Sequence, residues 1–309
     1  MKFKLLFISI LTIIFSLEIT AQQNKLLTHF IFDKMSVNPG ATGVGMRDGF
    51  CATAIFRNQW NRVNGAPNSG VFNAEGNFSR FFPGGVGLSF YHDAIGFARQ
   101  NNLVANYSYH LTLGDGILGI GAGVGLVGYG MQPDWITPDG NDEDESLPMG
   151  VTEFNLDANF GLYYLHNDGW YAGLSATHLP ASELELLNFQ TARHYYGLAG
   201  YKYKKAFDVD ELSLDFNAMM RTELVKFSAD LNVRAILKDM VWAGVTYRTE
   251  DAFGLMAGIE YNNFILGYSY DMSTHQLANV SRGSHEILFR YCYYLPPPPI
   301  TRSRNPRYL

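Results

Sequence analysis

Apolar and polar residues alternate along most of the chain after residue 50, in blocks of about ten residues. In the segment 224–235, Phe227 and Leu231 fall on one face, whereas Asp230 and Arg234 fall on the other. A period of two residues predicts β-strands, because successive side chains leave a strand on opposite faces. Full charges in the middle of strands, opposite a face rich in Tyr and Phe, are typical of a transmembrane barrel rather than of a soluble sandwich.

The alternation divides into about fourteen blocks, an even number as in single-chain bacterial outer-membrane barrels. The blocks cover residues 50–60, 69–78, 85–92, 101–111, 116–129, 153–164, 169–178, 193–204, 210–221, 224–235, 240–248, 252–261, 263–271 and 284–294. The predicted fold is therefore all-β. We expect a transmembrane antiparallel β-barrel of about fourteen strands, with an N-terminal segment that could plug the lumen.

The connections between blocks differ in length. Those after the even-numbered blocks are short and have the chemistry of tight turns, such as Gly114-Asp115-Gly116 and Asn262-Asn263. Those after the odd-numbered blocks tend to be longer and cover 61–68, 93–100, 130–152, 179–192 and 272–283, although 222–223 and 249–251 are short. Because outer-membrane barrels have short periplasmic turns and long outer loops, this pattern predicts that both termini lie in the periplasm.

Residues 1–21 have the features of a secretory signal peptide. A basic start is followed by an apolar stretch from Leu5 to Leu17, and Ala21 ends a small-residue cleavage site. No cysteine lies at this site, so a lipoprotein anchor is not expected. Beyond the signal no run of about 18 apolar residues occurs, so no helix is expected to span a membrane.

Two further segments fall outside the alternating blocks. Residues 22–49 contain Asn38-Pro39 and several glycines, which indicates irregular backbone folded inside the barrel or across its periplasmic mouth. The end of the chain is rich in proline and arginine, and we expect it in the periplasm as a disordered tail or a docking peptide. The predicted organisation is a signal peptide over 1–21, a plug segment over 22–49, a barrel over 50–295 and a tail over 296–309.

One block has a bare inner face. It carries Gly119, Gly121, Gly123 and Gly125, and the apolar residues between them must face lipid, so the glycines face the lumen. A wall without side chains allows close packing. Two interpretations follow: the N-terminal segment or a partner peptide occupies the lumen there, or the strand uses glycine for curvature.

Charged residues of both signs are predicted to face the lumen. They are Arg57, Glu153, Asp157, Asp215, Arg221, Lys226, Asp230, Arg234, Glu286 and Arg290. Mixed signs favour pairing in a structural network, because a buried unpaired charge is costly. An open and selective channel that keeps these groups hydrated is the other interpretation.

The first and last strands must pair in a closed barrel, because an open edge in lipid leaves backbone groups unsatisfied. Alternation turns Cys51 and Arg57 inward on the first strand, and Glu286, Arg290 and Cys292 inward on the last. One register would set the two cysteines opposite each other and would also set Arg57 against Glu286. A disulfide is permitted in the oxidising periplasm, and two free thiols in a slightly shifted register are the alternative.

Composition and motifs narrow the classes of function. A formal net charge of −6 argues against a nucleic-acid partner. No CxxC, HExxH or clustered Cys/His pattern occurs, so no metal or cofactor is expected, and the acidic loop 139–145 lacks EF-hand spacing and is better explained as solvated. Ser281 and Ser284 lie near His285, but no Asp or Glu is convincingly placed to orient its ring as in a serine hydrolase, so an enzyme is not expected.

Several stretches together resemble the PorP/SprF family of outer-membrane proteins linked to type IX secretion. They are Phe32 to Gly43 with Asn38-Pro39, Arg57-x-Gln59-Trp60, Asp93-x-x-Gly96, Ser269-Tyr270-Asp271 and Gly283-Ser284-His285-Glu286-Ile287. Their order and spacing carry the resemblance over residues 28–294. The chain has Gly40 where the family usually has alanine after Asn-Pro, and its tail has no counterpart in the pattern.

The resemblance implies a barrel in the outer-membrane lipid without enzymatic activity. It implies a role in secretion or surface anchoring of type IX cargo such as gliding adhesins, with a periplasmic peptidoglycan-binding lipoprotein as a further partner. The alternative is a fatty-acid-type transporter of hydrophobic small molecules, which also uses about fourteen strands and an N-terminal plug. Charges along the lumen wall disfavour an apolar ligand path.

Overall fold

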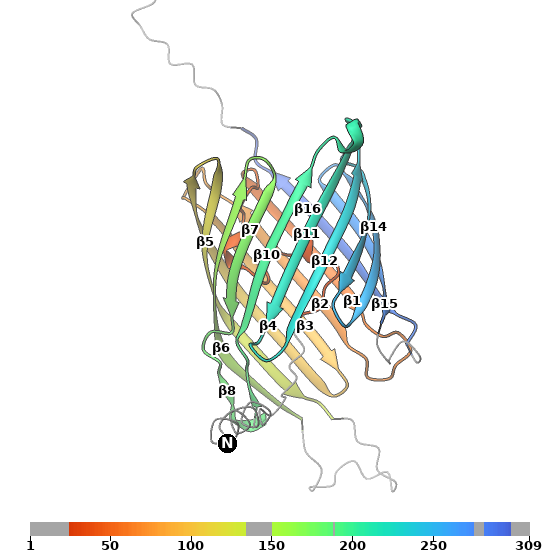
Figure 1. The fold of residues 1–309 in the computed structure, drawn as a ribbon. Helices are drawn as coiled ribbons and strands as arrows, with labels where there is room; N and C mark the ends of the chain where they lie inside the picture. Colours follow the sequence, from red (N-terminus) through yellow and green to blue (C-terminus); the bar gives the residue numbers. More distant parts are fainter. Residues whose placement is uncertain (1–24, 134–149, 188, 275–280, 298–309) are drawn as a thin grey trace, which may run out of the picture.

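The computed structural model describes residues 25–133, 150–187, 189–274 and 281–297, and within them the chain forms a closed antiparallel barrel (Figure 1). The barrel strands are β1 (Gly49–Asn58), β2 (Asn68–Asn77), β3 (Gly85–Ile95), β4 (Ala98–Leu113), β5 (Gly116–Met131), β6 (Val151–His166), β7 (Trp170–Thr177), β10 (His194–Tyr203), β11 (Leu212–Thr222), β12 (Phe227–Leu237), β13 (Val241–Arg248), β14 (Ala252–Tyr261), β15 (Phe264–Ser273) and β16 (Ser284–Tyr294). Each strand pairs with its sequence neighbour and β1 closes on β16, so the predicted fold of 14 strands is confirmed.

Period-two alternation explains the barrel wall. Along β12, Leu231 and Val233 are exposed on the outer face, whereas Asp230 and Asn232 are buried. Large apolar side chains cover the outer face of the other strands in the same way, as expected for a surface in contact with lipid. Among the described residues, no helix is long and apolar enough to cross a membrane.

The connections define two ends of the barrel. The long-loop end carries 59–67, 178–193 and 274–283, and a small sheet of β8 (Glu183–Leu184) and β9 (Phe189–Gln190) extends beyond the wall there (Figure 1). The short-turn end carries tight connections such as 114–115, 167–169 and 262–263, together with two longer ones, 78–84 and 204–211, the second of which holds η4 (Ala206–Asp208).

Two expectations about strand ends are wrong. The predicted loop 93–100 is a turn of residues 96–97, because β3 and β4 pair as far as Ile95 and Ala98. Gly96 there has φ +54°, which glycine adopts without strain. Lys226 does not face the lumen, since β12 begins only at Phe227 and Lys226 is exposed in the preceding connection.

Residues 25–48 lie inside the barrel and plug it. This plug contains two short 3-10 turns, η1 (Phe30–Phe32) and η2 (Pro39–Ala41), and most of its side chains are buried. Its apolar residues form two buried clusters with inward side chains of the wall. Phe30 and Ile31 belong to the same cluster as Trp242, and Leu27 belongs to a second one with Ile55. The plug therefore supplies the hydrophobic interior that a barrel wall with polar inward residues lacks.

The plug runs through the lumen from one mouth to the other. Its first described residue, Lys25, accepts a hydrogen bond from Arg221 at the long-loop end of β11, 3.0 Å away. Its last residue, Asp48, accepts one from Leu295 just after β16, at the short-turn end. The ends of the described chain thus lie toward opposite mouths. The expectation that both termini lie in the periplasm stays a prediction, because residues 1–24 and 298–309 lie outside the described residues. The signal peptide over 1–21 lies outside the described residues.

The seam between β1 and β16 has the register with facing cysteines. Cys51 lies opposite Cys292, Ile55 opposite Leu288, and Arg57 opposite Glu286. The two sulfurs form a disulfide at the short-turn end, with the Cα atoms 4.0 Å apart. The bond ties the first barrel strand covalently to the last.

The disulfide gives a direct chemical expectation. Thiol titration of the unfolded, unreduced protein should find no free thiol, because the chain has 2 cysteines and both are bonded. The double variant Cys51→Ser/Cys292→Ser should have a free energy of unfolding that is lower by about 2–4 kcal/mol, since the cross-link no longer restricts the unfolded chain. Two titratable thiols in the unreduced wild type would contradict the seam.

Candidate functional site

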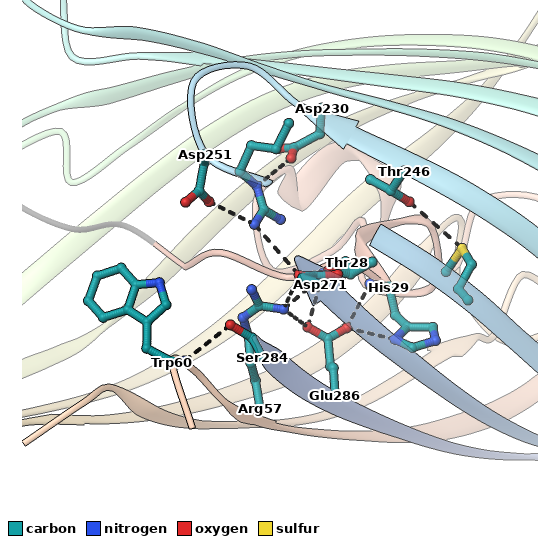
Figure 2. Close-up of polar contacts among 12 residues, drawn as sticks. Thr28, His29, Arg57, Trp60, Asp230, Thr246, Asp251, Asp271, Ser284 and Glu286 are labelled. Carbon is teal, nitrogen blue, oxygen red and sulfur yellow. Dashed lines mark hydrogen bonds and ion pairs between the residues drawn. The ribbon is translucent and has the colours of Figure 1, made fainter. Parts of the chain in front are cut away.

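Glu286 fastens the start of the plug to the wall. It is fully buried on β16, and one carboxylate oxygen accepts a hydrogen bond from the backbone N–H of His29 at 2.7 Å and lies 2.6 Å from its ring Nδ1. The other oxygen accepts from the N–H of Thr28 at 3.0 Å and from Arg57 at 3.2 Å. Figure 2 shows these groups converging on the carboxylate from the plug and from the strands of the seam. One side chain thus satisfies two plug N–H groups.

Asp271 on β15 forms the second contact. Its Oδ2 accepts a hydrogen bond from the Thr28 hydroxyl at 2.6 Å and lies 2.7 Å from the guanidinium of Arg57. The Thr28 hydroxyl oxygen in turn accepts from Arg57 at 3.1 Å. Thr28 therefore joins two wall residues that come from strands on either side of β16 (Figure 2).

The network continues around the wall to the entrance of the plug. Asp230 on β12 lies 2.5 Å from Arg248 and 2.8 Å from Arg221. Arg248 also pairs with Asp251 at 3.1 Å, and Arg221 donates to the Lys25 carbonyl. We call the combined set the anchor cluster: Thr28, His29, Arg57, Arg221, Asp230, Arg248, Asp271 and Glu286.

The charges of the anchor cluster balance. Three arginines face three carboxylates, and all six side chains are at most 7% exposed. Removing one partner of such a pair leaves a buried charge without compensation, which typically costs about 3–5 kcal/mol. The cluster therefore fixes the plug strongly at this mouth, and its geometry requires the plug backbone at Thr28 and His29.

The glycine wall holds the middle of the plug. A Cβ at Gly119 or Gly121 would overlap the backbone of η2 at Pro39 and Gly40, so only glycine allows this approach. A Cβ at Gly123 or Gly125 would instead meet residues of β4. Of the two interpretations of the glycine face, packing by the N-terminal segment applies to the first pair, and close strand geometry applies to the second.

Two further contacts secure the plug. Arg290 donates to the Phe32 carbonyl at 3.3 Å and pairs with Glu75 at 3.5 Å, while Glu75 accepts from the N–H of Gly43 at 3.0 Å. On the other side the Trp242 ring packs against those of Phe32 and His29, with centroids 5.5 and 5.9 Å apart. These contacts connect the plug to three regions of the wall, on β2, β13 and β16.

The lumen charges are mostly paired, as the structural interpretation expected. Arg234 lies 2.7 Å from Asp215, and Asp157 lies 3.0 Å from His178. A hollow beside the plug, lined by residues such as Lys25, Ser36 and Asp157, has a volume of 20 Å³. That space corresponds to about one water molecule, which is too small for a solute path.

This architecture has a counterpart among known proteins. Residues 19–291 match the family of type IX secretion system membrane proteins PorP/SprF. The chain belongs to the PorP/SprF family. No curated protein matches its sequence.

Similar solved structures include other outer-membrane barrels. The Acinetobacter baumannii outer-membrane protein Omp33 has 7% sequence identity and a TM-score of 0.48, with 81% of this chain and 100% of that chain covered. The monoaromatic hydrocarbon channel CymD has 13% identity and a TM-score of 0.48, with 85% and 93% covered.

The residues on which the sequence resemblance rests fall into two groups. One group serves the plug: Asn38 accepts from the N–H of Gly40 at 2.9 Å and donates to the Leu162 carbonyl at 3.0 Å, and Pro39 begins η2. Asp271 belongs to this group through the anchor cluster. These residues hold the plug at two levels of the lumen.

The second group shapes the long-loop end. Gln59 is buried, the Trp60 N–H donates to the Ser284 hydroxyl at 3.1 Å, and Asp93 accepts from the Ser69 hydroxyl at 2.8 Å. Gly283 has φ +77°. His285 does not join the anchor cluster; its ring lies 2.7 Å from the hydroxyl of Tyr268.

Some residues that matter were missed from the sequence. Arg248 and Trp242 lie on the inward face of β13, and the alternation over 240–248 could have identified both. Thr28 and His29 lie in an irregular segment, which has no periodic signal. The acidic loop 139–145 lies outside the described residues. No group of three or more His, Cys, Asp or Glu within the described ranges could hold a metal ion.

Proposed function

We propose that this PorP/SprF protein is a non-enzymatic outer-membrane barrel that assists type IX secretion by holding cargo at its long-loop end. The single observation that carries this role is the plug, which fills the lumen and is fastened at one mouth by hydrogen bonds from Thr28 and His29 to buried carboxylates of the wall. A filled lumen cannot conduct a folded cargo domain. Cargo contacts therefore belong on the loops, and the cargo class that the family implies is a secreted protein such as a gliding adhesin.

The other proposed contacts follow from orientation. We place the long-loop end outside the cell and the short-turn end in the periplasm, because outer-membrane barrels have short periplasmic turns. A periplasmic peptidoglycan-binding lipoprotein would then meet the short-turn end. A fatty-acid-type transporter is the second candidate function, and the paired charges and small hollow of the lumen argue against it.

Orientation is testable with exposed loop residues. In whole cells a membrane-impermeant maleimide should label Asn64→Cys in the connection 59–67, and should not label Asp168→Cys in the turn 167–169, because only the first faces the medium. Both positions are exposed, and the native cysteines are bonded. Lysed cells control for reactivity, since both variants should then be labelled. The reverse pattern in whole cells would invert the barrel.

The role as a holder rather than a conduit predicts that a locked plug remains functional. The hydroxyl oxygens of Ser36 and Ser89 lie 3.2 Å apart, so Ser36→Cys/Ser89→Cys should form a disulfide between the plug and β3 in the oxidising periplasm. In a strain that lacks the native protein, the locked variant should support surface display of type IX cargo as well as wild type does.

The control for this experiment is Ser36→Cys alone, which cannot form the cross-link. Peptide mapping without reduction shows whether the plug is locked and whether the native disulfide remains. If the locked variant loses cargo display and a reductant restores it, plug movement is required. That result would replace the proposed role with a conduit or transporter.

A further inference from the structure

A polar hollow lies at the long-loop end, between the connection 59–67 and the β3–β4 turn. Its volume is 310 Å³, and it lies apart from the lumen and the plug. The lining residues are Asn58, Gln59, Trp60, Asn61, Arg62, Val63, Asn64, Gly65, Ala66, Asn68, Ala94, Gly96 and Arg99. None of them takes part in the anchor cluster.

The walls of this rim hollow are held by backbone hydrogen bonds. The connection 59–67 is closed by Gln59 donating to Pro67, and Asn61 exchanges hydrogen bonds with the segment 282–283 that precedes β16. Gly96 in the β3–β4 turn donates to Gly65 at 2.9 Å. The loop thus has a defined shape at the rim, and a ligand that binds there need not order it.

The chemistry of the lining is unusual for this chain. The protein has 29 acidic and 23 basic residues, yet the rim hollow contains two arginines and no carboxylate. The Arg99 guanidinium donates to the carbonyls of Gly96 and Ala98, and neither Arg62 nor Arg99 has an ion-pair partner among the described residues. Four asparagines and one glutamine supply amide donors and acceptors beside them.

We propose that the rim hollow binds an acidic saccharide. Guanidinium groups bind carboxylate, sulfate or phosphate oxygens through paired hydrogen bonds, and side-chain amides both donate to and accept from sugar hydroxyls. The lining includes one aromatic residue, Trp60. The other apolar residues are small, Val63, Ala66 and Ala94, so a lipid chain or an apolar peptide would find little area to bury.

The proposal is tested by titration calorimetry on the purified, disulfide-bonded barrel in detergent. Tetragalacturonate is the acidic probe, and maltotetraose is the neutral probe of the same length. We expect saturable binding of the acidic probe and at least tenfold weaker binding of the neutral one. Arg62→Ala/Arg99→Ala should weaken binding of the acidic probe at least tenfold. The affinity of Arg62→Lys/Arg99→Lys for this probe should lie between those of wild type and the alanine variant, because lysine keeps the charge but lacks the planar guanidinium.

A matched control distinguishes binding in the rim hollow from nonspecific attraction of the acidic probe to positive charge. Arg193→Ala/Lys226→Ala removes two positive charges from exposed positions at the same end of the barrel but outside the hollow, and it should bind the acidic probe like wild type. Heat-modifiable mobility in SDS gel electrophoresis, in which the unheated folded barrel migrates differently from the heated chain, confirms that each variant keeps its barrel. Absence of saturable binding to wild type, or an equal loss in the control variant, would overturn the proposal. Neither outcome depends on secretion, so the proposed function is tested separately.

Discussion

A barrel carrying Glu286→Ala should lose the protection of its plug while its strands stay intact. The substitution leaves the N–H groups of Thr28 and His29 without their buried acceptor. It also removes one of the two carboxylates that pair with Arg57, so that Asp271 alone remains against this guanidinium. A loss of about 3–5 kcal/mol is typical for such a break, which raises the population of released plug by more than about a hundredfold. Trypsin cleavage after Lys34, followed by mass spectrometry, measures this release, because Lys34 lies in the lumen against the Tyr171 ring.

Glu250→Ala is the matched control for the anchor. Glu250 is an exposed glutamate in the connection between β13 and β14, so its removal should leave the cleavage rate at Lys34 unchanged. Heat-modified gel mobility reports the barrel independently of the plug. If trypsin cleaves after Lys34 no faster in the Glu286→Ala variant than in wild type, the anchor cluster does not hold the plug.

Trp242→Ala should destabilise the protein by about 3–5 kcal/mol, the usual cost of emptying a buried tryptophan site. The ring is 2% exposed and packs between the plug and the wall. It also fills the space beside Gly258 and Gly267, where an added Cβ would meet it. Urea unfolding of the reconstituted barrel measures the loss of stability, and cleavage after Lys34 shows how much of that loss concerns the plug.

Trp170→Ala provides the comparison for the same residue type. Trp170 is 39% exposed at the short-turn end and stacks on His166, so its replacement leaves no enclosed cavity and should cost much less. An equal loss of stability in the two variants would mean that the lumen around Trp242 collapses to fill the space. In that case the plug contacts of Trp242 contribute little to the fold.

The strands and their seam were accessible from the sequence for a simple reason. Period-two alternation fixes which side chains face the lumen, and closure then forces the first strand against the last, so Arg57 and Glu286 could be aligned from parity and register. The glycine face of β5 could be assigned to the lumen by the same rule. Connections were less predictable, because pairing between β3 and β4 extends through residues expected to form a loop.

The path of the plug could not be derived in this way. Its backbone is irregular, so no period shows which side chains point to the wall. The N–H groups by which Thr28 and His29 also bind Glu286 are present in every residue except proline. The direction of threading depends on where those groups meet Glu286, which is a tertiary contact. Arg248 and Trp242 needed no such knowledge, since alternation along β13 already turns them inward.

The disulfide at the seam gives the chain the topology of a lasso. Bonding Cys51 to Cys292 closes the barrel backbone into a covalent ring, and the plug, which precedes Cys51, passes through that ring to the far mouth. A force that pulls Lys25 out of the long-loop end would stretch the plug through the barrel. Because the plug is joined to the ring at Cys51, the covalent backbone and the disulfide would then carry the force. A pull toward the short-turn end would only have to break the plug contacts. The resistance to force should therefore depend on its direction.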